Sequence, residues 1–260
     1  EVETLTIGGV SRASSERIEA AGKGVNVALA LHVNGVPARA IAAMAPAAAR
    51  RYVELLSQPG ILEVIAVSGL IRTNVAVVEP HGVVTKVNGP GPHYDAATLA
   101  AVTQELGLRI AGSRWMVLSG SLPPGCPDDT YATLVALGRT AGCRVAIDAD
   151  GEALRRGVDA RPDVIKPNRP ELEALAGQSV HTVGDAIDAA ADLVARGVGA
   201  VLCSLGPDGA LLVTEHATLH AWVPPLLSVD SHVGAGDALL AGYLSCPDEA
   251  HAALRAAVAW

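Results

Sequence analysis

The residues best suited to chemistry lie near the end of the chain, in a glycine-rich turn at 233–237 (Val-Gly-Ala-Gly-Asp) that an apolar run follows. Glycines let the backbone turn sharply and bring several N–H groups to face one point. The helix expected after the turn adds its unpaired N-terminal donors and the positive end of its dipole. Asp237 is the one carboxylate among these donors. The segment therefore predicts an anion pocket with a built-in base, which suits phosphoryl transfer to an alcohol, although an acid that caps the first turn of a helix has the same pattern.

Polar residues also follow other short apolar runs, and each of these segments has a structural interpretation beside a functional one. Asn168 and Glu171 have the spacing of a capping box, and they are also two oxygen groups able to hold water around Mg²⁺. Asp148 can act on phosphates or a metal, or it can cap the next helix. The loops at 119–125 and 203–209 offer hydroxyl and backbone donors to a sugar or a nucleotide, or they are plain turns.

Two cationic side chains nearer the front of the chain have informative neighbours. Lys23 lies in a Gly-Lys-Gly segment at the start of an expected helix that reaches about His32. A lysine at a helix N-terminus opposes the dipole, and this unfavourable placement indicates a bound anion or a polyol contact. Arg72, which two small polar residues follow, suits a phosphate monoester, although a solvated arginine is the plain alternative.

These segments need a scaffold, which the spacing of apolar residues predicts. Short β-branched runs alternate with helical segments from about residue 115 to residue 203, which favours a parallel sheet with helices on both faces. Ligands of such sheets bind beyond the carboxyl ends of the strands, where the polar segments lie. Residues 1–21, 73–78 and 82–87 alternate like antiparallel strands around a turn at 80–82. We expect them to form a small separate sheet that serves as a lid, a dimer surface or both.

Composition narrows the class of protein. The 260 residues allow one large domain, half of them are hydrophobic, and the net charge of −8 disfavours a nucleic-acid partner. The four cysteines have no CxxC spacing, which favours reduced thiols, a cytoplasmic location and no zinc site. No apolar run is long enough to predict a membrane span. The chain has no initiator Met and ends in a helical pattern without a stop signal, so we expect it to be truncated at both ends.

The order of the motifs along the chain is more specific than any one of them. The series is GKGVNVA (22–28), RTN (72–74), SGSLPPG (119–125), DADGEAL (148–154), KPNRPEL (166–172), SLGPDGA (204–210) and VGAGDALLAGYL (233–244). It resembles the PfkB, or ribokinase-like, carbohydrate kinases and looks most like their 1-phosphofructokinase and tagatose-6-phosphate kinase branch. The resemblance spans residues 2–260, and the glycine–aspartate turn and the GKGxN helix are its most specific parts.

The resemblance implies a ribokinase-like three-layer α/β/α sandwich with a mainly parallel sheet and a small β-sheet lid. It implies one kinase domain over 1–260, with the lid at about 1–21 and 72–90 and the α/β core at about 22–71 and 91–260. It also implies ATP, Mg²⁺, a phosphosugar acceptor and a homodimer through the lid. We expect fructose 1-phosphate as acceptor; the sequence does not separate it from tagatose 6-phosphate or fructose 6-phosphate.

The resemblance assigns roles residue by residue. The general base would be Asp237, and the anion hole would be the backbone of Gly234, Ala235 and Gly236. The phosphosugar would meet Gly22, Lys23, Gly24, Asn26, Arg72 and Ser121, and its phosphate would also meet Arg12, with a contact across a dimer as one option. The nucleotide would meet Ser204, Gly206, Gly209 and Lys166. Asn168 and Glu171 would organise Mg²⁺ through water.

Some positions depart from the family pattern. The family's first core strand would precede Glu1, Gly89 stands where an acidic residue is usual, and His232 replaces a small hydroxyl residue before the glycine turn. The imidazole of His232 would add a pH-dependent positive charge beside the anion pocket. These departures leave a second hypothesis, a non-catalytic sensor of sugar phosphates or nucleotides on the same fold. A nucleoside kinase is a third, against which Lys23 and Arg72 argue because they suit an acceptor that already carries phosphate.

Overall fold

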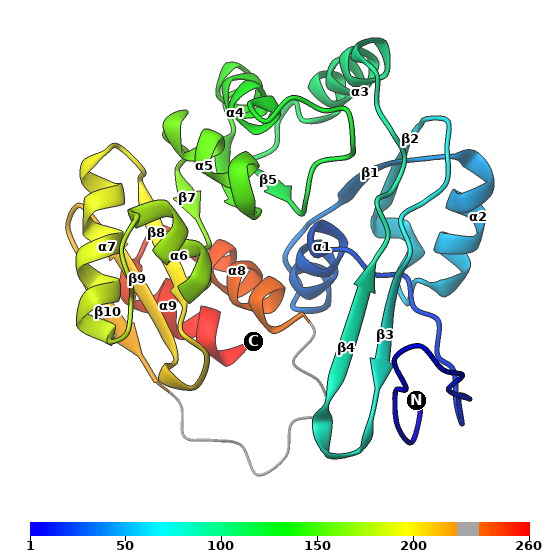
Figure 1. Ribbon diagram of the computed structural model, residues 1–260. Helices are drawn as coiled ribbons and strands as arrows, with labels where there is room; N and C mark the ends of the chain where they lie inside the picture. The colour runs from blue at the N-terminus through cyan, green and yellow to red at the C-terminus, as the bar shows by residue number, and fades with distance from the viewer. Residues whose placement is uncertain (223–233) are drawn as a thin grey trace.

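The strands of the computed structural model, which describes residues 1–222 and 234–260, form one large sheet and two small ones (Figure 1). They are β1 (Ala40–Met44), β2 (Leu62–Ala66), β3 (Asn74–Val78), β4 (Val84–Asn88), β5 (Trp115–Ser119), β6 (Arg144–Asp148), β7 (Val164–Ile165), β8 (Ala200–Ser204), β9 (Ala210–Thr214) and β10 (Thr218–Ala221). The large sheet has the order β10-β9-β8-β7-β6-β5. Its strands β5 to β8 are parallel, whereas β8, β9 and β10 pair antiparallel. The prediction of a mainly parallel sheet is therefore confirmed.

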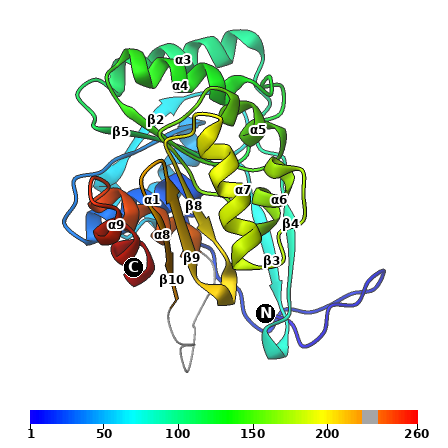
Figure 2. The ribbon, with the colours of Figure 1, turned by 90° about the vertical axis from the view of Figure 1, so that its left-hand side faces the viewer.

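Helices cover both faces of this sheet. The α-helices are α1 (Lys23–Val33), α2 (Pro46–Leu55), α3 (Ala96–Arg109), α4 (Thr130–Thr140), α5 (Gly151–Asp159), α6 (Arg169–Ala176), α7 (Val183–Ala195), α8 (Ala235–Ser245) and α9 (Ala250–Ala259), and short 3₁₀ turns are η1 (Pro59–Ile61), η2 (Pro80–Gly82) and η3 (Gly206–Asp208). Figure 2 shows α1, α8 and α9 on one side of the strands and α6 and α7 on the other. Among the described residues, each helix is too short or too polar to cross a membrane.

Alternate residues of the buried strands pack into different layers. In β8, Val201 and Cys203 belong to the core beneath α4 to α7, while Ala200 and Leu202 face α1, α8 and α9. Successive side chains of a strand point to opposite faces, so a strand covered on both sides must be apolar throughout. This explains why the sequence of β8 is a continuous apolar run and not an alternating one.

Helix α1 also belongs to a second apolar cluster. Val27 and Leu31 contribute to the core of the large sheet, whereas Val25 and Ala28 pack with residues of β1 and α2. The small parallel sheet β1-β2 shares no hydrogen-bonded ladder with the large sheet among the described residues. Packing on α1 therefore ties the two parts of the molecule together.

The hairpin β3-β4 confirms the antiparallel strands expected at 73–78 and 82–87, with η2 as their turn (Figure 1). The strands expected within residues 1–21 are wrong. That segment has one isolated bridge, between Val2 and Ala13, and it meets the hairpin where the Val2 N–H donates to the Val78 carbonyl at 3.0 Å. Its apolar residues Ile7 and Val10 are exposed. Alternation alone does not make a strand, because a strand needs a surface on which its apolar face can pack.

Candidate active site

Asp237 lies in the first turn of α8, and the N-terminus of this helix is open. Gly234 precedes the helix in a left-handed conformation (φ 87°), and no described side chain caps it, so its first N–H groups have no partner within the helix. Asp237 is only 7% exposed, and its Oδ2 accepts a hydrogen bond from Asn26 Nδ2 at 2.7 Å. Burial raises the pKa of Asp237 above its ordinary value, despite the opposing effect of the Asn26 bond.

Asp148, at the end of β6, is a fully buried carboxylate that joins two lysines. It is 0% exposed, and its Oδ1 lies 2.9 Å from Lys23 Nζ and 3.3 Å from Lys166 Nζ. Its Oδ2 has no hydrogen-bond partner among the described residues. The N-cap of α5 is Asp150, so the interpretation of Asp148 as a helix cap is wrong. Two ammonium groups around one carboxylate leave positive charge near Asp237.

Lys23 and Lys166 approach the carboxylate of Asp148 from different elements, α1 and the residue after β7. Burial lowers the pKa of Lys23, but the charge and hydrogen bond of Asp148 outweigh that effect, so the pKa lies above its ordinary value. Asp148 thereby offsets the unfavourable placement of Lys23 at a helix N-terminus. Lys166 Nζ lies 3.1 Å from the position that a Cβ atom on Gly236 would take. The absence of a side chain at Gly236 lets this ammonium group approach the open end of α8.

Arg72 and Ser121 meet at a cavity of about 170 Å³, lined in addition by residues 43–45, 68–71 and 90–92. The guanidinium of Arg72 donates to Ser121 Oγ through Nη1, and its Nε donates to Asn74 Oδ1 at 3.0 Å. The Gly120 N–H donates to the carbonyl of Asp148 at 2.9 Å. The loop that carries Ser121 therefore continues directly from the Asp148 cluster at the same edge of the sheet.

The turn between β8 and β9 carries Ser204, Gly206 and Gly209. Both glycines are left-handed, with φ 62° and 87°, and a Cβ atom on Gly209 would lie 2.1 Å from the carbonyl oxygen of Ala221. The hairpin itself thus requires glycine at these positions, as the plain-turn interpretation holds. The Ser204 N–H donates to the carbonyl of Pro167 at 3.1 Å, so the turn lies beside the start of α6.

Asn168 and Glu171 form the expected capping box of α6. Asn168 Oδ1 accepts from the Glu171 N–H at 2.9 Å, and Glu171 Oε2 accepts from the Asn168 N–H at 2.8 Å. Nowhere in 1–222 or 234–260 do three or more His, Cys, Asp and Glu side chains gather as a metal cage. Mg²⁺ usually keeps several waters and takes one or two carboxylates together with substrate phosphates. The donor set fits a water-mediated ion, because the cap leaves Oε1 of Glu171 unused.

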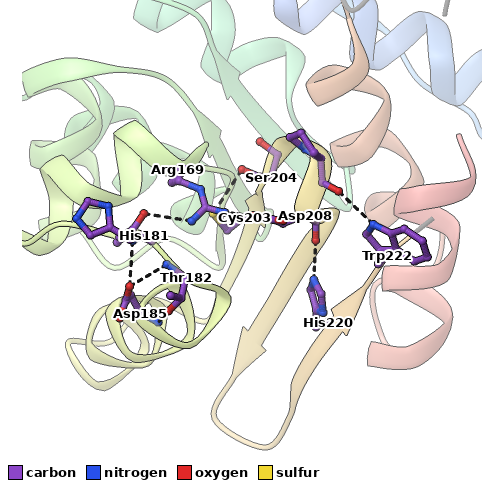
Figure 3. A network of polar contacts seen from close by, with 11 residues as sticks. Arg169, His181, Thr182, Asp185, Cys203, Ser204, Asp208, His220 and Trp222 are labelled. Carbon is purple, nitrogen blue, oxygen red and sulfur yellow. Dashed lines mark hydrogen bonds and ion pairs between the residues drawn. The ribbon is translucent and has the colours of Figure 1, made fainter. Parts of the chain in front are cut away.

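Arg169 and Trp222 hold the β8-β9 turn from different elements (Figure 3). Arg169 Nη2 pairs with Asp208 Oδ2 at 2.6 Å and its Nη1 donates to the Val180 carbonyl at 3.1 Å. Trp222 Nε1 donates to the Pro207 carbonyl at 3.2 Å. Sequence reasoning missed these contacts, since partners so far apart along the chain share no local pattern.

The other residues that the sequence analysis assigned to the site lie in different parts of the molecule. Gly22 is the N-cap residue of α1, and Gly24 faces Ser119, with 3.7 Å between its Cβ position and the Cβ of Ser119. Arg12 is exposed on the irregular segment, and no hydrogen bond or ion pair joins it to another residue that the structure describes. Lys166 lies with Asp148 and beside Gly236 and not on the β8-β9 turn at 204–209. His232 lies outside the described residues.

Comparisons with known proteins identify the relatives of this chain. The model of the pfkB family carbohydrate kinases matches residues 2–259. The 1-phosphofructokinase of Rhodobacter capsulatus is 39% identical over 250 residues, covering 93% of this chain and 79% of that protein. That of Xanthomonas campestris is 40% identical over 251 residues, covering 93% and 78%. Phosphofructokinase-2 from Escherichia coli, crystallised in complex with substrates and products, matches with a TM-score of 0.90 at 28% identity, covering 99% of this chain and 86% of that chain.

The family match covers almost the whole sequence. The structure adds an open helix start, a buried aspartate and two lysines, which lie at one edge of a mainly parallel sheet. The chain belongs to the pfkB family of carbohydrate kinases.

Proposed function

We propose that this kinase transfers a phosphoryl group from ATP to a hydroxyl of fructose 1-phosphate and forms fructose 1,6-bisphosphate. The observation that carries the proposal is the buried pair of Asp237 and Asn26 at the open start of α8. The names of the relatives from R. capsulatus and X. campestris support the acceptor. Fructose 6-phosphate is the alternative, because E. coli phosphofructokinase-2 was crystallised with that sugar; tagatose 6-phosphate is a further candidate.

Asp237 is the general base in this proposal. Asn26 Nδ2 occupies Oδ2, which orients the carboxylate and leaves Oδ1 for the proton of the acceptor hydroxyl. A pKa raised by burial makes the carboxylate a stronger proton acceptor than an exposed aspartate. The proton of the attacking hydroxyl passes to Asp237 as the new O–P bond forms.

Backbone donors and lysines stabilise the charge of the transferring group. The N–H groups at Gly234, Ala235 and Gly236 face the anion at the start of α8. The ammonium group of Lys166 stands against the same helix start, and Lys23 lies across Asp148 from it. Asp148 fixes both ammonium groups before substrate arrives, so little reorganisation accompanies the reaction.

Arg72 and Ser121 bind the phosphate that the acceptor already carries. A guanidinium that also holds Asn74 is a preorganised donor for a phosphate monoester. Gly22 and Gly24 shape the neighbouring sugar site around Lys23, and Arg12 reaches the same phosphate from the N-terminal segment. An acceptor held at both ends places its free hydroxyl at Asp237.

The β8-β9 turn holds the nucleotide through Ser204, Gly206 and Gly209, with Lys166 beside its terminal phosphate. ATP supplies the phosphoryl group, and Mg²⁺ neutralises phosphate charge when bound. Asn168 and Glu171 would hold that ion through water, from the capped start of α6. The four cysteines are free thiols, which supports a cytoplasmic kinase.

The hairpin β3-β4, with residues 1–21, forms the lid and carries a dimer surface. Its valines Val75, Val83, Val84 and Val87 are exposed, although Val75 and Val87 pair across the two strands. Side chains alternate along a strand, so Val84 lies on the opposite face and the apolar pair Val75 and Val87 marks the face proposed for the dimer. A second copy of this chain covers it in the proposal; a tetrameric form is known for E. coli phosphofructokinase-2.

Measuring ADP release with the three acceptors tests the proposed reaction. We expect kcat/KM for fructose 1-phosphate to exceed that for fructose 6-phosphate and tagatose 6-phosphate by about tenfold or more, because a site that binds one arrangement of polar groups leaves its own groups unpaired with another. A preference for another acceptor overturns the substrate assignment. Binding of a sugar phosphate without any ADP release supports the sensor hypothesis instead.

Asp237→Asn tests the general base. The amide keeps the shape and an acceptor for Asn26 but cannot take the proton, so kcat should fall by roughly 10²–10⁴ while ATP binding measured by calorimetry stays unchanged. Asp188→Asn, on the exposed side of α7, is the matched control and should leave kcat as it is. Near-normal turnover by Asp237→Asn rules out the assignment.

The same variant tests the raised pKa of Asp237. The folded-state pKa lies above the unfolded value, so the buried carboxylate destabilises the fold above that folded pKa and costs nothing once the pH is below both values. Asp237→Asn should therefore have a higher Tm than the parent near pH 8, and the difference should shrink towards pH of about 4. Thermal melts across this range measure it; a lower Tm for the variant at every pH contradicts it.

A charged substitution on the β3-β4 hairpin tests whether the hairpin forms the dimer interface. Val87→Glu should shift the protein from dimer to monomer in sedimentation velocity, because a carboxylate replaces a buried apolar contact. Leu108→Glu, an exposed leucine on α3 away from the hairpin, is the control and should not change the mass. A monomeric parent, or a dimer that Val87→Glu leaves intact, excludes this surface.

A further inference from the structure

Trp222 is an exposed aromatic side chain next to the turn that binds nucleotide in the proposed function. It directly follows β10 and is 55% exposed, while its Nε1 donates to the Pro207 carbonyl at 3.2 Å (Figure 3). The chain has only three tryptophans and no phenylalanine. Single exposed apolar residues are ordinary on a protein surface, so the place of Trp222 beside this turn, and not its exposure, is the informative feature.

Neighbouring residues hold this indole in place. A Cβ atom on Gly209 would lie 3.0 Å from the Cα of Trp222, so the glycine turn packs directly against the tryptophan backbone. The hydrogen bond to Pro207 fixes the ring edge. His220, on β10, contacts the Asp208 carbonyl oxygen through Nε2 at 2.6 Å. Three consecutive residues of the turn are thus held from the β10 side.

The charge of the turn is also compatible with an anionic ligand. Its one acid, Asp208, is paired with Arg169 of α6 at 2.6 Å, so the carboxylate is neutralised on the side away from β10. An indole bound by its N–H edge keeps its flat face available. Aromatic faces bind bases by stacking, which favours a flat heterocycle attached to phosphates over a plain apolar group.

We propose that Trp222 stacks on the base of the nucleotide whose phosphates and ribose lie along the turn from Ser204 to Gly209. The proposal rests on the nucleotide site of the proposed function and adds the residue that recognises the base. Trp222 contributes affinity for nucleotides and none for their phosphates alone.

Binding of ATP and of inorganic tripolyphosphate to Trp222→Leu and Trp222→Phe tests the assignment. We expect Trp222→Leu to raise the Kd of ATP about 5- to 150-fold, the range that loss of one stacking partner gives, and to leave the Kd of tripolyphosphate unchanged. Trp222→Phe keeps a stacking face and should bind ATP nearly as the parent does. Fluorescence of the parent should be quenched by ATP but not by tripolyphosphate, because Trp115 packs under Arg144 and Trp260 is partly buried.

Each other outcome has a definite meaning. Equal Kd values of ATP for Trp222→Leu and the parent overturn the stacking role and leave the proposed kinase intact. Equal losses of ATP and tripolyphosphate affinity show that Trp222 only positions the turn, which also overturns it. A parent that binds neither ligand refutes the nucleotide site itself, and with it the proposed function.

Discussion

The burial of the Asp148 carboxylate is the constraint on which the rest of the site depends. A carboxylate without exposed surface stays charged only where cations or hydrogen bonds compensate it, because an isolated charge in the interior costs many kcal/mol. Here the cations come from α1 and from the residue after β7, so Lys23 and Lys166 must converge on the end of β6. Parallel pairing of β5, β6 and β7 brings these chain segments to one edge. The two lysines that balance this buried charge are also the two to which the proposed function gives a role at the phosphates.

Helix α1 connects this charge cluster with the buried carboxylate of Asp237. Lys23 and Asn26 are three residues apart, hence on one face of the helix, and they contact Asp148 and Asp237 respectively. Apolar side chains on other faces of α1 hold the helix in place. Val25 packs towards β1 and α2, and Val27 packs towards the large sheet. A rigid helix between two apolar clusters therefore sets the distance between the two carboxylates.

Local patterns predicted the parts of the molecule that local physics determines. The glycine turn before Asp237 and the capping box of Asn168 depend on neighbours in the sequence, and both were found there. The strands expected in residues 1–21 failed because alternation says nothing about whether a packing surface exists. The double pairing of Asp148 depends on lysines from α1 and from the residue after β7, and the anchoring of Trp222 depends on a turn that precedes it by 15 residues. No spacing in one sequence reveals such contacts.

Two contacts couple the hairpin side of the molecule to the core. Arg72, just before β3, bonds Ser121, which follows β5, and the Tyr94 N–H after β4 donates to the Pro124 carbonyl at 2.8 Å in the same loop. Both chain connections of the hairpin thus end on the loop that leads from β5, whose Gly120 is bound to Asp148. A phosphate held by Arg72 would act on the position of the hairpin and on the Asp148 loop together. The hairpin and the Asp148 cluster therefore share one loop, and in the proposed function an acceptor phosphate bound by Arg72 would contact both through that loop.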